Sequence, residues 1–159
     1  MSQNDIVLVV SVSVMKDNKV LLIKENKPSA YNKWNFPSGR IESNEDILEA
    51  AKREVKEETG LEIKFLNTTG VYNFISETNH QVFMFHFIGE ITAGRVKLAE
   101  DEILDSKWVS LQELMHLRNE EIRNPLVIRQ IVKALQSSDF YSKTIFLEKL
   151  SAFGKVGGK

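Results

Sequence analysis

Three glutamates, Glu54, Glu57 and Glu58, occupy positions i, i+3 and i+4 of a segment with helical character. At this spacing the side chains are neighbours on the helix surface, and each like-charged pair destabilises a helix by roughly 0.2–0.5 kcal/mol. A cation bound between them would reverse the sign of that interaction. Ligand sets made only of oxygen suit Mg²⁺ or Mn²⁺. The spacing therefore indicates a candidate metal site, although three glutamates alone also fit a solvated acidic helix face.

The residues around the glutamates extend the pattern and favour the metal site over the solvated face. Nine positions are fixed between residues 39 and 61: Gly39, Glu45, Arg53, Glu54, Val55, Glu57, Glu58, Gly60 and Leu61. In type and spacing they resemble the Nudix box at every defined position, with Val55 and Leu61 at the aliphatic places. The chain thus resembles Nudix hydrolases, which cleave a nucleoside diphosphate linked to another moiety, X.

The resemblance implies a role for each residue of the box. Glu54, Glu57 and Glu58 correspond to metal ligands, and Glu54 or a downstream acid corresponds to the general base. Arg53 would orient the glutamates, and the backbone carbonyl of Gly39 or Ser38 would contact a metal. Mg²⁺, with Mn²⁺ as a possible substitute, would neutralise phosphate oxygens and activate a water for attack on the phosphoanhydride.

Further site residues are expected outside the box. Nudix enzymes often add an acid ahead of a later strand; we expect Glu102 in that role, as a catalytic and metal-binding residue, with Glu100 as the alternative. Candidate substrate-binding residues are Arg40, Ser38, Lys24 and Trp34, the last because an aromatic ring can stack on a base. Core packing is the alternative role for Trp34. Lys27 and Lys33 are further candidates for phosphate contacts. Each of these cations, taken singly, also fits an ordinary surface charge.

The helix that carries the glutamates is predicted to run from about Glu45 to Thr59. Ile47, Leu48, Ala51 and Val55 share one apolar arc at 100° per residue, and Glu58 falls at its edge. A carboxylate there is partly desolvated unless a cation or an arginine compensates it. Ser43 or Asn44 is the expected N-cap, Gly60 the expected stop, and Glu49 the expected i, i+4 partner of Arg53.

The remaining chain predicts strands with one further helix near its end. Valines alternate with Ser11 and Ser13 in a two-residue period, and residues 16–19 form the expected hairpin turn. Further strands are expected at 20–24, 62–69 with 71–76 (as two strands or one bent strand), 81–91 and 103–109. A helical turn is expected at 111–116 and a helix at 126–135, with Pro125 in its first turn. Such an order gives an α/β or α+β fold, and the resemblance implies the Nudix α/β/α sandwich with a mixed sheet.

We predict a Nudix domain over residues 1–137 and a C-terminal segment over 138–159. Residues 139–153 are apolar enough to dock on the domain or on a partner, and 154–159 are expected to be mobile. The net charge of −1, with no basic block, argues against nucleic acid or anionic membrane as a partner. The absence of cysteine excludes disulfides and thiolate chemistry and is compatible with a cytoplasmic protein. His80 and His86 would share a strand face, but a zinc pair is disfavoured.

Two short stretches of sequence outside the helix that carries the glutamates narrow the class of substrate that we expect. Residues 34–39, Trp-Asn-Phe-Pro-Ser-Gly, and 122–127, Ile-Arg-Asn-Pro-Leu-Val, resemble a phosphatase-like Nudix branch that acts on nucleoside di- and triphosphates and thiamine-type pyrophosphates. Ser38 departs from the usual Gly or Ala, but it is small enough for the turn. An ADP-ribose or nucleotide-sugar pyrophosphatase is the alternative enzyme, although few residues precede the first strand; a catalytically silent ligand-binding domain is the non-enzymatic alternative. Monomer and homodimer both stay open.

Overall fold

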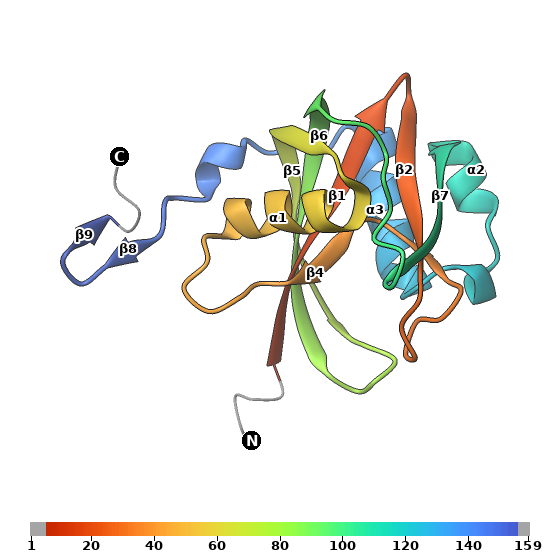
Figure 1. Ribbon diagram of the computed structural model, residues 1–159, viewed down its shortest axis with the longest axis horizontal. Coiled ribbons are helices and arrows are strands. Elements are labelled where there is room, and N and C mark those ends of the chain that lie inside the picture. The colour runs from red at the N-terminus through yellow and green to blue at the C-terminus, as the bar shows by residue number, and fades with distance from the viewer. Residues whose placement is uncertain (1–5, 156–159) are drawn as a thin grey trace.

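A mixed β-sheet between two helical layers organises the chain in the computed structural model, which describes residues 6–155 (Figure 1). The strands are β1 (Ile6–Lys16), β2 (Lys19–Glu25), β3 (Trp34–Asn35), β4 (Ser38–Arg40), β5 (Glu62–Ile75), β6 (Gln81–Ala93) and β7 (Ile103–Ser110), with a separate small hairpin of β8 (Leu150–Ser151) and β9 (Gly154–Lys155). The helices are α1 (Ile47–Thr59), α2 (Leu111–His116) and α3 (Pro125–Ser137), with short 3-10 turns at Asn119–Glu121 and Lys143–Ile145.

The sheet of seven strands contains one parallel pair, β1 with β6, in register from Ile6–Gln81 to Met15–Glu90. All its other pairs are antiparallel. In Figure 1, α1 lies in front of the sheet and α3 behind it. The predicted mixed-sheet α/β/α sandwich is therefore confirmed. None of the helices within residues 6–155 is long and apolar enough to cross a membrane.

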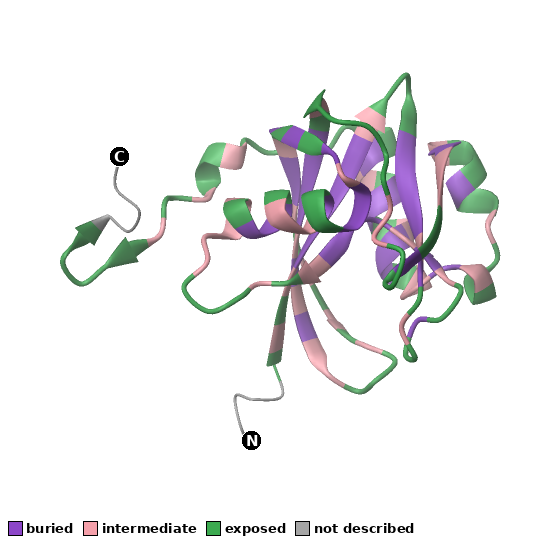
Figure 2. Cartoon of the chain, viewed as in Figure 1, coloured by how far each residue is buried: buried purple, intermediate pink, exposed green. Residues whose placement is uncertain are grey.

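Alternation along β1 sends its side chains to two separate cores, because successive residues of a strand point to opposite faces. Val10, Val12 and Val14 pack with Ala51 and Val55 of α1. The opposite face of the sheet packs on α3, whose buried side chains are Val127, Ile128, Ile131, Val132 and Leu135. Figure 2 shows the buried parts of the chain, in purple, concentrated in the sheet between the helical layers.

Two buried serines of β1 form hydrogen bonds with both ring nitrogens of a histidine. This histidine lies in the α3-side core, the core between the sheet and α3. Ser13 Oγ lies 2.7 Å from Nε2 of His86, and Ser11 Oγ lies 3.0 Å from its Nδ1. Burial lowers the pKa of His86 to about 3, so the ring is neutral at ordinary pH. His80 precedes β6 and bonds Thr78 through Nδ1 instead. The two histidines thus have unrelated local roles.

Several predicted boundaries agree with the structure. Asp17 and Asn18 both have positive φ in the β1–β2 hairpin, as a two-residue type I′ turn requires. Gly60 has φ 77° and closes α1 through its N–H to Lys56, and α3 begins at Pro125 as expected. The stretch from Glu62 to Ile75 is one strand with register shifts, which selects the bent-strand alternative.

The start of α1 differs from the prediction. The helix begins at Ile47, and Asp46 caps it by accepting a hydrogen bond from the Leu48 N–H at 3.1 Å. Neither Ser43 nor Asn44 is the cap. Glu45 lies outside the helix because the backbone of Asp46 is extended, and its carboxylate accepts hydrogen bonds from the Glu42 N–H and from Arg53. The turn that holds Glu45 therefore delays the helix by two residues.

The segment after α3 returns to the body along β5 and ends near α1. Tyr141 forms a bridge with Thr68, Lys143 Nζ donates to the Phe65 carbonyl, and the Phe146 ring contacts Phe87 with centroids 5.1 Å apart. The β8–β9 hairpin then extends away from the sandwich and is exposed (Figures 1 and 2). Of the stretch expected to be mobile, 154–155 form β9 and 156–159 lie outside the described residues. The domain boundary at 137 stays a prediction.

Candidate active site

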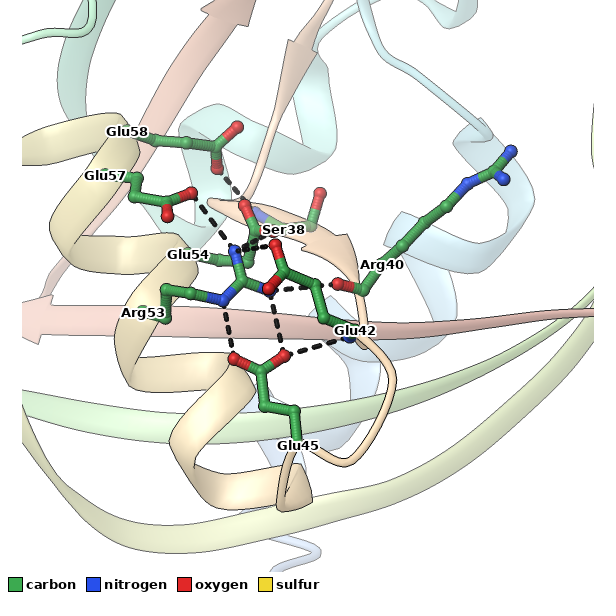
Figure 3. Close-up of polar contacts among 8 residues, drawn as sticks. All are labelled: Ser38, Arg40, Glu42, Glu45, Arg53, Glu54, Glu57 and Glu58. Carbon is green, nitrogen blue, oxygen red and sulfur yellow. Dashed lines mark hydrogen bonds and ion pairs between the residues drawn. The ribbon is translucent and has the colours of Figure 1, made fainter.

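The three box glutamates lie where the C-terminal half of α1 meets the turn around β4 (Figure 3). Helix packing on β1 and β4 places them there: Ala51 and Val55 are buried against the sheet, and the glutamates lie toward Ser38 and Gly39. The three carboxylates differ in their surroundings. Glu58 is buried, Glu54 is intermediate and Glu57 is exposed.

Arg53 holds the acidic cluster together. Its Nε and Nη2 donate to the two oxygens of Glu45 at 2.6 and 3.0 Å, and Nη1 donates to Glu54 at 2.9 Å and Glu57 at 3.1 Å. Nη2 also donates to the Arg40 carbonyl at 3.1 Å. The hydrogen bonds that Arg53 donates to Glu45 raise the pKa of Arg53 and lower the pKa of Glu45. The predicted Glu49 pair does not form, because the guanidinium turns to the Glu45 side.

Glu58 is a buried carboxylate with one oxygen unpaired. The residue is 1% exposed, and its Oε1 accepts a hydrogen bond from the Ser38 N–H at 2.8 Å. Its Oε2 is buried without a hydrogen-bond partner among the described residues. Burial raises the pKa of Glu58 well above its usual value. Leaving a charged acceptor unpaired in the interior costs about 1–3 kcal/mol or more, which a cation at Oε2 would offset.

Glu54 lies directly against Gly39. A Cβ placed on Gly39 would collide with the Glu54 carboxylate, so only glycine permits this approach. Burial raises the pKa of Glu54, and its bond to Arg53 opposes the rise. Gly39 therefore has a steric role that sequence reasoning did not assign, in addition to any contact of its carbonyl.

The donor set suits a hard divalent cation, because it consists of carboxylate and carbonyl oxygens. The orphan Oε2 of Glu58 is the observation that supports the fit. The ligands are not gathered into a closed cluster, however: among residues 6–155, no three His, Cys, Asp or Glu side chains are placed together as a metal group. Glu57 is turned to Arg53 and would have to rotate to join Glu54 and Glu58.

A cavity of about 220 Å³ opens beside this cluster, between the sheet and α3. Ser38, Gly39 and Arg40 form its wall near the glutamates, and the Arg40 side chain lies away from them (Figure 3). Lys27 also lines it, and neither Lys27 nor Arg40 forms a side-chain ion pair with a described residue. The apolar part of the wall consists of Val7, Val9, Phe36, Phe74, Val82, Met84, Val127, Ile128 and Ile131.

Comparison with known proteins agrees with this geometry. A family model described as the NUDIX domain matches residues 5–130. The chain belongs to the NUDIX family. A NUDIX hydrolase structure from Nitrosomonas europaea superposes with a TM-score of 0.80 at 27% identity, covering 90% of this chain and 97% of the other.

Three named relatives align with most of the chain. Zebrafish 8-oxo-dGDP phosphatase NUDT18 is 34% identical over 107 residues, which are 65% of this chain but 32% of NUDT18. ADP-ribose pyrophosphatase of Methanocaldococcus jannaschii is 34% identical over 105 residues, covering 65% of this chain and 62% of that one. Phosphatase NudJ of Escherichia coli is 29% identical over 133 residues, covering 83% and 84%. The chain thus spans about a third of the length of NUDT18.

Two of the predicted substrate contacts lie outside the cavity of this NUDIX domain. Trp34 is 8% exposed and packs in the α3-side core, with Lys24 Nζ 4.8 Å and Lys107 Nζ 4.3 Å from its ring centroid. β3 pairs with β2 so that Trp34 lies opposite Lys24 in the register. Neither Trp34 nor Lys24 lines the cavity, and Lys33 pairs with Glu77.

The predicted acid Glu102 lies in an exposed turn whose backbone is attached to the site. The Ala99 N–H donates to the Glu58 carbonyl at 3.3 Å, and the Glu102 carbonyl accepts from the Asn26 N–H at 2.9 Å. The side chains of Glu100 and Glu102 make no hydrogen bond or ion pair with the described residues. The role of either acid stays a prediction.

Three polar residues of the site were missed from the sequence: Glu25, Asn35 and Arg123. Glu25 is fully buried and bonds both of the others. Asn35 and Arg123 lie inside the two stretches that resemble the phosphatase-like branch, but nothing in one sequence shows that they share a partner. A glutamate at the end of the apolar run Val20–Ile23 was the available signal for a buried charge.

Proposed function

We propose that this NUDIX domain hydrolyses a phosphoanhydride bond of nucleoside di- or triphosphates, or of related small pyrophosphates, with Mg²⁺. The observation that carries the proposal is the buried, half-satisfied carboxylate of Glu58 beside a cavity lined by Lys27 and Arg40, neither of which forms an ion pair within residues 6–155. NUDT18 and NudJ, whose names state phosphatase activity, support the same reaction class.

Glu54 and Glu58, joined by Glu57 after rotation, would hold the metal. A bound Mg²⁺ would supply neutralisation of phosphate oxygens and a water of lowered pKa. Arg53 keeps Glu54 and Glu57 beside each other despite their like charges, since one Nη1 group donates to both. Glu45 anchors that guanidinium from the opposite side, so the position of the glutamates depends on a residue that does not line the cavity.

Glu54 is our choice for the general base, with Glu102 as the other candidate. Its carboxylate is intermediate in exposure and lies against Gly39 at the cavity wall. Burial raises its pKa, and a base accepts a proton more readily as its pKa approaches the working pH.

Lys27 and Arg40 are the groups that would bind the phosphate chain. Both line the cavity next to Ser38 and Gly39, and the charge of Lys27 acts on Glu54 and Glu58, since it lowers the pKa of each. Its positive charge thus lies on the same side of the cavity as the glutamates, where it would favour a bound phosphate. The apolar wall on the α3 side would cover the rest of the substrate.

The test is hydrolysis of a panel of nucleoside di- and triphosphates, ADP-ribose, nucleotide sugars and thiamine pyrophosphate, with orthophosphate and pyrophosphate resolved. We expect Mg²⁺-dependent turnover of di- or triphosphates. In the double variant Glu57→Gln/Glu58→Gln this turnover should fall at least about 100-fold, the scale typical of losing transition-state charge stabilisation. Glu49→Gln is the matched control, because Glu49 is exposed on the same helix and forms no ion pair with the part of the chain that the structure describes. Absence of turnover with Mg²⁺ and Mn²⁺ on the whole panel would overturn the proposal.

The second candidate is an ADP-ribose or nucleotide-sugar pyrophosphatase. The archaeal relative named ADP-ribose pyrophosphatase favours it, at the same identity as NUDT18. Turnover confined to ADP-ribose or a nucleotide sugar would select this candidate. Since the panel contains both classes, one experiment decides between them.

A further inference from the structure

The buried carboxylate of Glu25 joins two parts of the site that are far apart in the chain. Its Oε2 accepts a hydrogen bond from Nη1 of Arg123 at 2.8 Å, and its Oε1 accepts one from Nδ2 of Asn35 at 2.9 Å. The Glu25 side chain is 0% exposed. A buried carboxylate is stable only when it is paired and hydrogen-bonded, and here Arg123 supplies the pairing. Glu25 is therefore fixed, and it fixes both of its neighbours.

Both N–H donors and the oxygen of the Asn35 amide are engaged in hydrogen bonds. An amide side chain offers two N–H donors and one oxygen. Nδ2 donates to Glu25 and also to Oγ of Ser38 at 3.1 Å, while Oδ1 accepts the Phe36 N–H at 2.8 Å. The side chain thus holds the turn between β3 and β4 from three directions.

Ser38 connects Asn35 to α1, because its hydroxyl contacts Asn35 and its backbone contacts a glutamate of the helix. Its backbone N–H donates to Oε1 of Glu58 at 2.8 Å. A continuous hydrogen-bonded path therefore runs from Arg123, two residues before α3, through Glu25, Asn35 and Ser38 to Glu58. Arg123, Asn35 and Ser38 also line the cavity, so the path forms part of its wall.

We propose that Asn35 and Glu25 are positioning residues for Glu58, and that Arg123 pairs with Glu25 and fixes the carboxylate so that it can hold Asn35. With Oε1 of Glu58 held by Ser38, Oε2 is the oxygen left for a cation. The inference rests on the proposed function in one respect, that Glu58 is a metal ligand. It goes further because it makes metal affinity at α1 depend on Arg123, two residues before α3.

A purely structural role for Asn35 and Arg123 would make different predictions. Loss of either side chain would then lower the unfolding temperature, while the folded fraction would bind metal and turn over substrate normally. A positioning role requires weaker metal binding by protein that is still folded. The discriminating measurement is equilibrium Mn²⁺ binding without substrate, read by electron paramagnetic resonance and calorimetry at a temperature where each variant is folded.

Asn35→Ala is the first variant, with Asn73→Ala as its control. Asn73 is an exposed asparagine on β5 whose amide oxygen bonds only Gln81. We expect the Mn²⁺ dissociation constant of Asn35→Ala to rise roughly 5-fold, the equivalent of one net hydrogen bond. Its kcat should fall by more than its KM for the nucleotide rises. Asn73→Ala should match the wild type in both.

Arg123 is tested by loss and rescue. Arg123→Gln leaves Glu25 buried without its counter-ion, and we expect weaker Mn²⁺ binding of similar size. Glu25→Gln combined with Arg123→Gln removes the charge but keeps an oxygen that can accept from Asn35. That double variant should regain Mn²⁺ affinity to within about 2-fold of wild type, since the Asn35 hydrogen bond returns. Arg118→Gln is the control, because Arg118 is exposed and pairs only with Glu121.

The outcomes separate this inference from the proposed function. If the wild type hydrolyses nucleotides but folded Asn35→Ala keeps wild-type Mn²⁺ affinity and kcat, the positioning role is wrong and the proposed function stands. If the wild type hydrolyses nothing on the panel but binds Mn²⁺, and Asn35→Ala binds it more weakly, the positioning role stands without the proposed function. A wild type that binds no Mn²⁺ overturns both.

Discussion

Nε of Arg53 lies 2.6 Å from Oε2 of Glu45, and Nη2 lies 3.0 Å from the other Glu45 oxygen. This forked contact joins the middle of α1 to the turn that precedes it. Bidentate pairs of this kind are among the stronger hydrogen bonds in proteins because both partners are charged and planar. The same guanidinium then has Nη1 left for Glu54 and Glu57. Glu45 therefore sets the direction from which Arg53 reaches Glu54 and Glu57.

Replacing Arg53 by lysine should remove the fork while keeping the charge. A lysine ammonium is a single point charge and cannot bridge Glu45, Glu54 and Glu57 in a plane. We expect kcat to fall at least 10-fold, with a loss of stability of about 1–2 kcal/mol, the scale of one or two net hydrogen bonds. Steady-state kinetics and urea unfolding measure the two effects. Arg118→Lys, an exposed single pair, should change neither; equal effects in both variants would contradict the interpretation.

Gly39→Ala should damage activity more than stability. The new Cβ would meet the carboxylate of Glu54, the far end of a flexible side chain that can swing aside. The fold should survive, but the proposed base would be displaced, and a displacement of about 1 Å can cost roughly 100-fold in rate.

Gly89→Ala is the matched comparison for Gly39→Ala. Its Cβ would lie 3.0 Å from Cδ1 of Ile63 and 3.2 Å from Cγ1 of Val12, both in the α1-side core. Overpacking there typically costs about 1–3 kcal/mol, so this variant should lose stability while folded protein keeps its kcat. Kinetics at a temperature well below unfolding separate the two variants. A Gly39→Ala enzyme with wild-type kcat would remove the steric role of Gly39.

Local patterns in the sequence were sufficient for the elements and for the acidic helix. The period of β1, the turn at Asp17–Asn18 and the stop at Gly60 each depend on a few adjacent residues, and all three are present in the structure. The spacing of the glutamates places them on one helix for the same reason. These features needed no knowledge of which segments meet in space.

Contacts between distant segments could not be read in the same way. Glu25 and Arg123 are 98 positions apart, and no periodicity relates them. Helix spacing alone favours Glu49 as the partner of Arg53. The turn before the helix brings Glu45 to the guanidinium instead, so Arg53 pairs with Glu45. Trp34 looked available for stacking, but its burial depends on Lys24, Lys107 and the α3-side core together. Pairing of strands and helices decides each of these cases.

Metal removal should affect stability through Glu58. Addition of Mg²⁺ at 100 times its dissociation constant should stabilise the wild type by about 2.7 kcal/mol, since only the folded state gathers the ligands. Glu58→Gln should be more stable than wild type without metal, because a neutral amide replaces a buried charge, and should gain little from Mg²⁺. Thermal unfolding with EDTA and with Mg²⁺ measures both. Glu49→Gln should respond to Mg²⁺ as the wild type does, and the same response from Glu58→Gln would exclude Glu58 as a ligand.

The C-terminal segment should contribute stability through Phe146. Its ring packs edge-on against Phe85 and Phe87, with centroids 5.8 and 5.1 Å away, and joins the α1-side core. Because the residue is only partly buried, Phe146→Ala should cost about 1–2 kcal/mol, less than the 3–5 kcal/mol of a fully buried phenylalanine. Leu147→Ala is the control, since Leu147 is 84% exposed. Chemical unfolding that gives equal stability for both variants would show that the segment does not pack on the body.

His86 should make the domain less stable as the pH falls. Burial holds its folded pKa at about 3, below the unfolded value near 6.5. Between these values the unfolded chain binds a proton that the folded protein excludes, so the free energy of unfolding falls with decreasing pH, by up to about 1.4 kcal/mol per pH unit.

The groups that contact the ring, Ser11, Ser13, Phe36 and Tyr72, carry no charge near pH 6 that could stabilise an imidazolium. The loss should therefore begin just below pH 6.5. Urea unfolding from pH 7.5 to 5 should show this slope in the wild type and in His116→Gln, an exposed control. It should be reduced in His86→Gln, and an unchanged slope in that variant would assign the pH dependence to other groups.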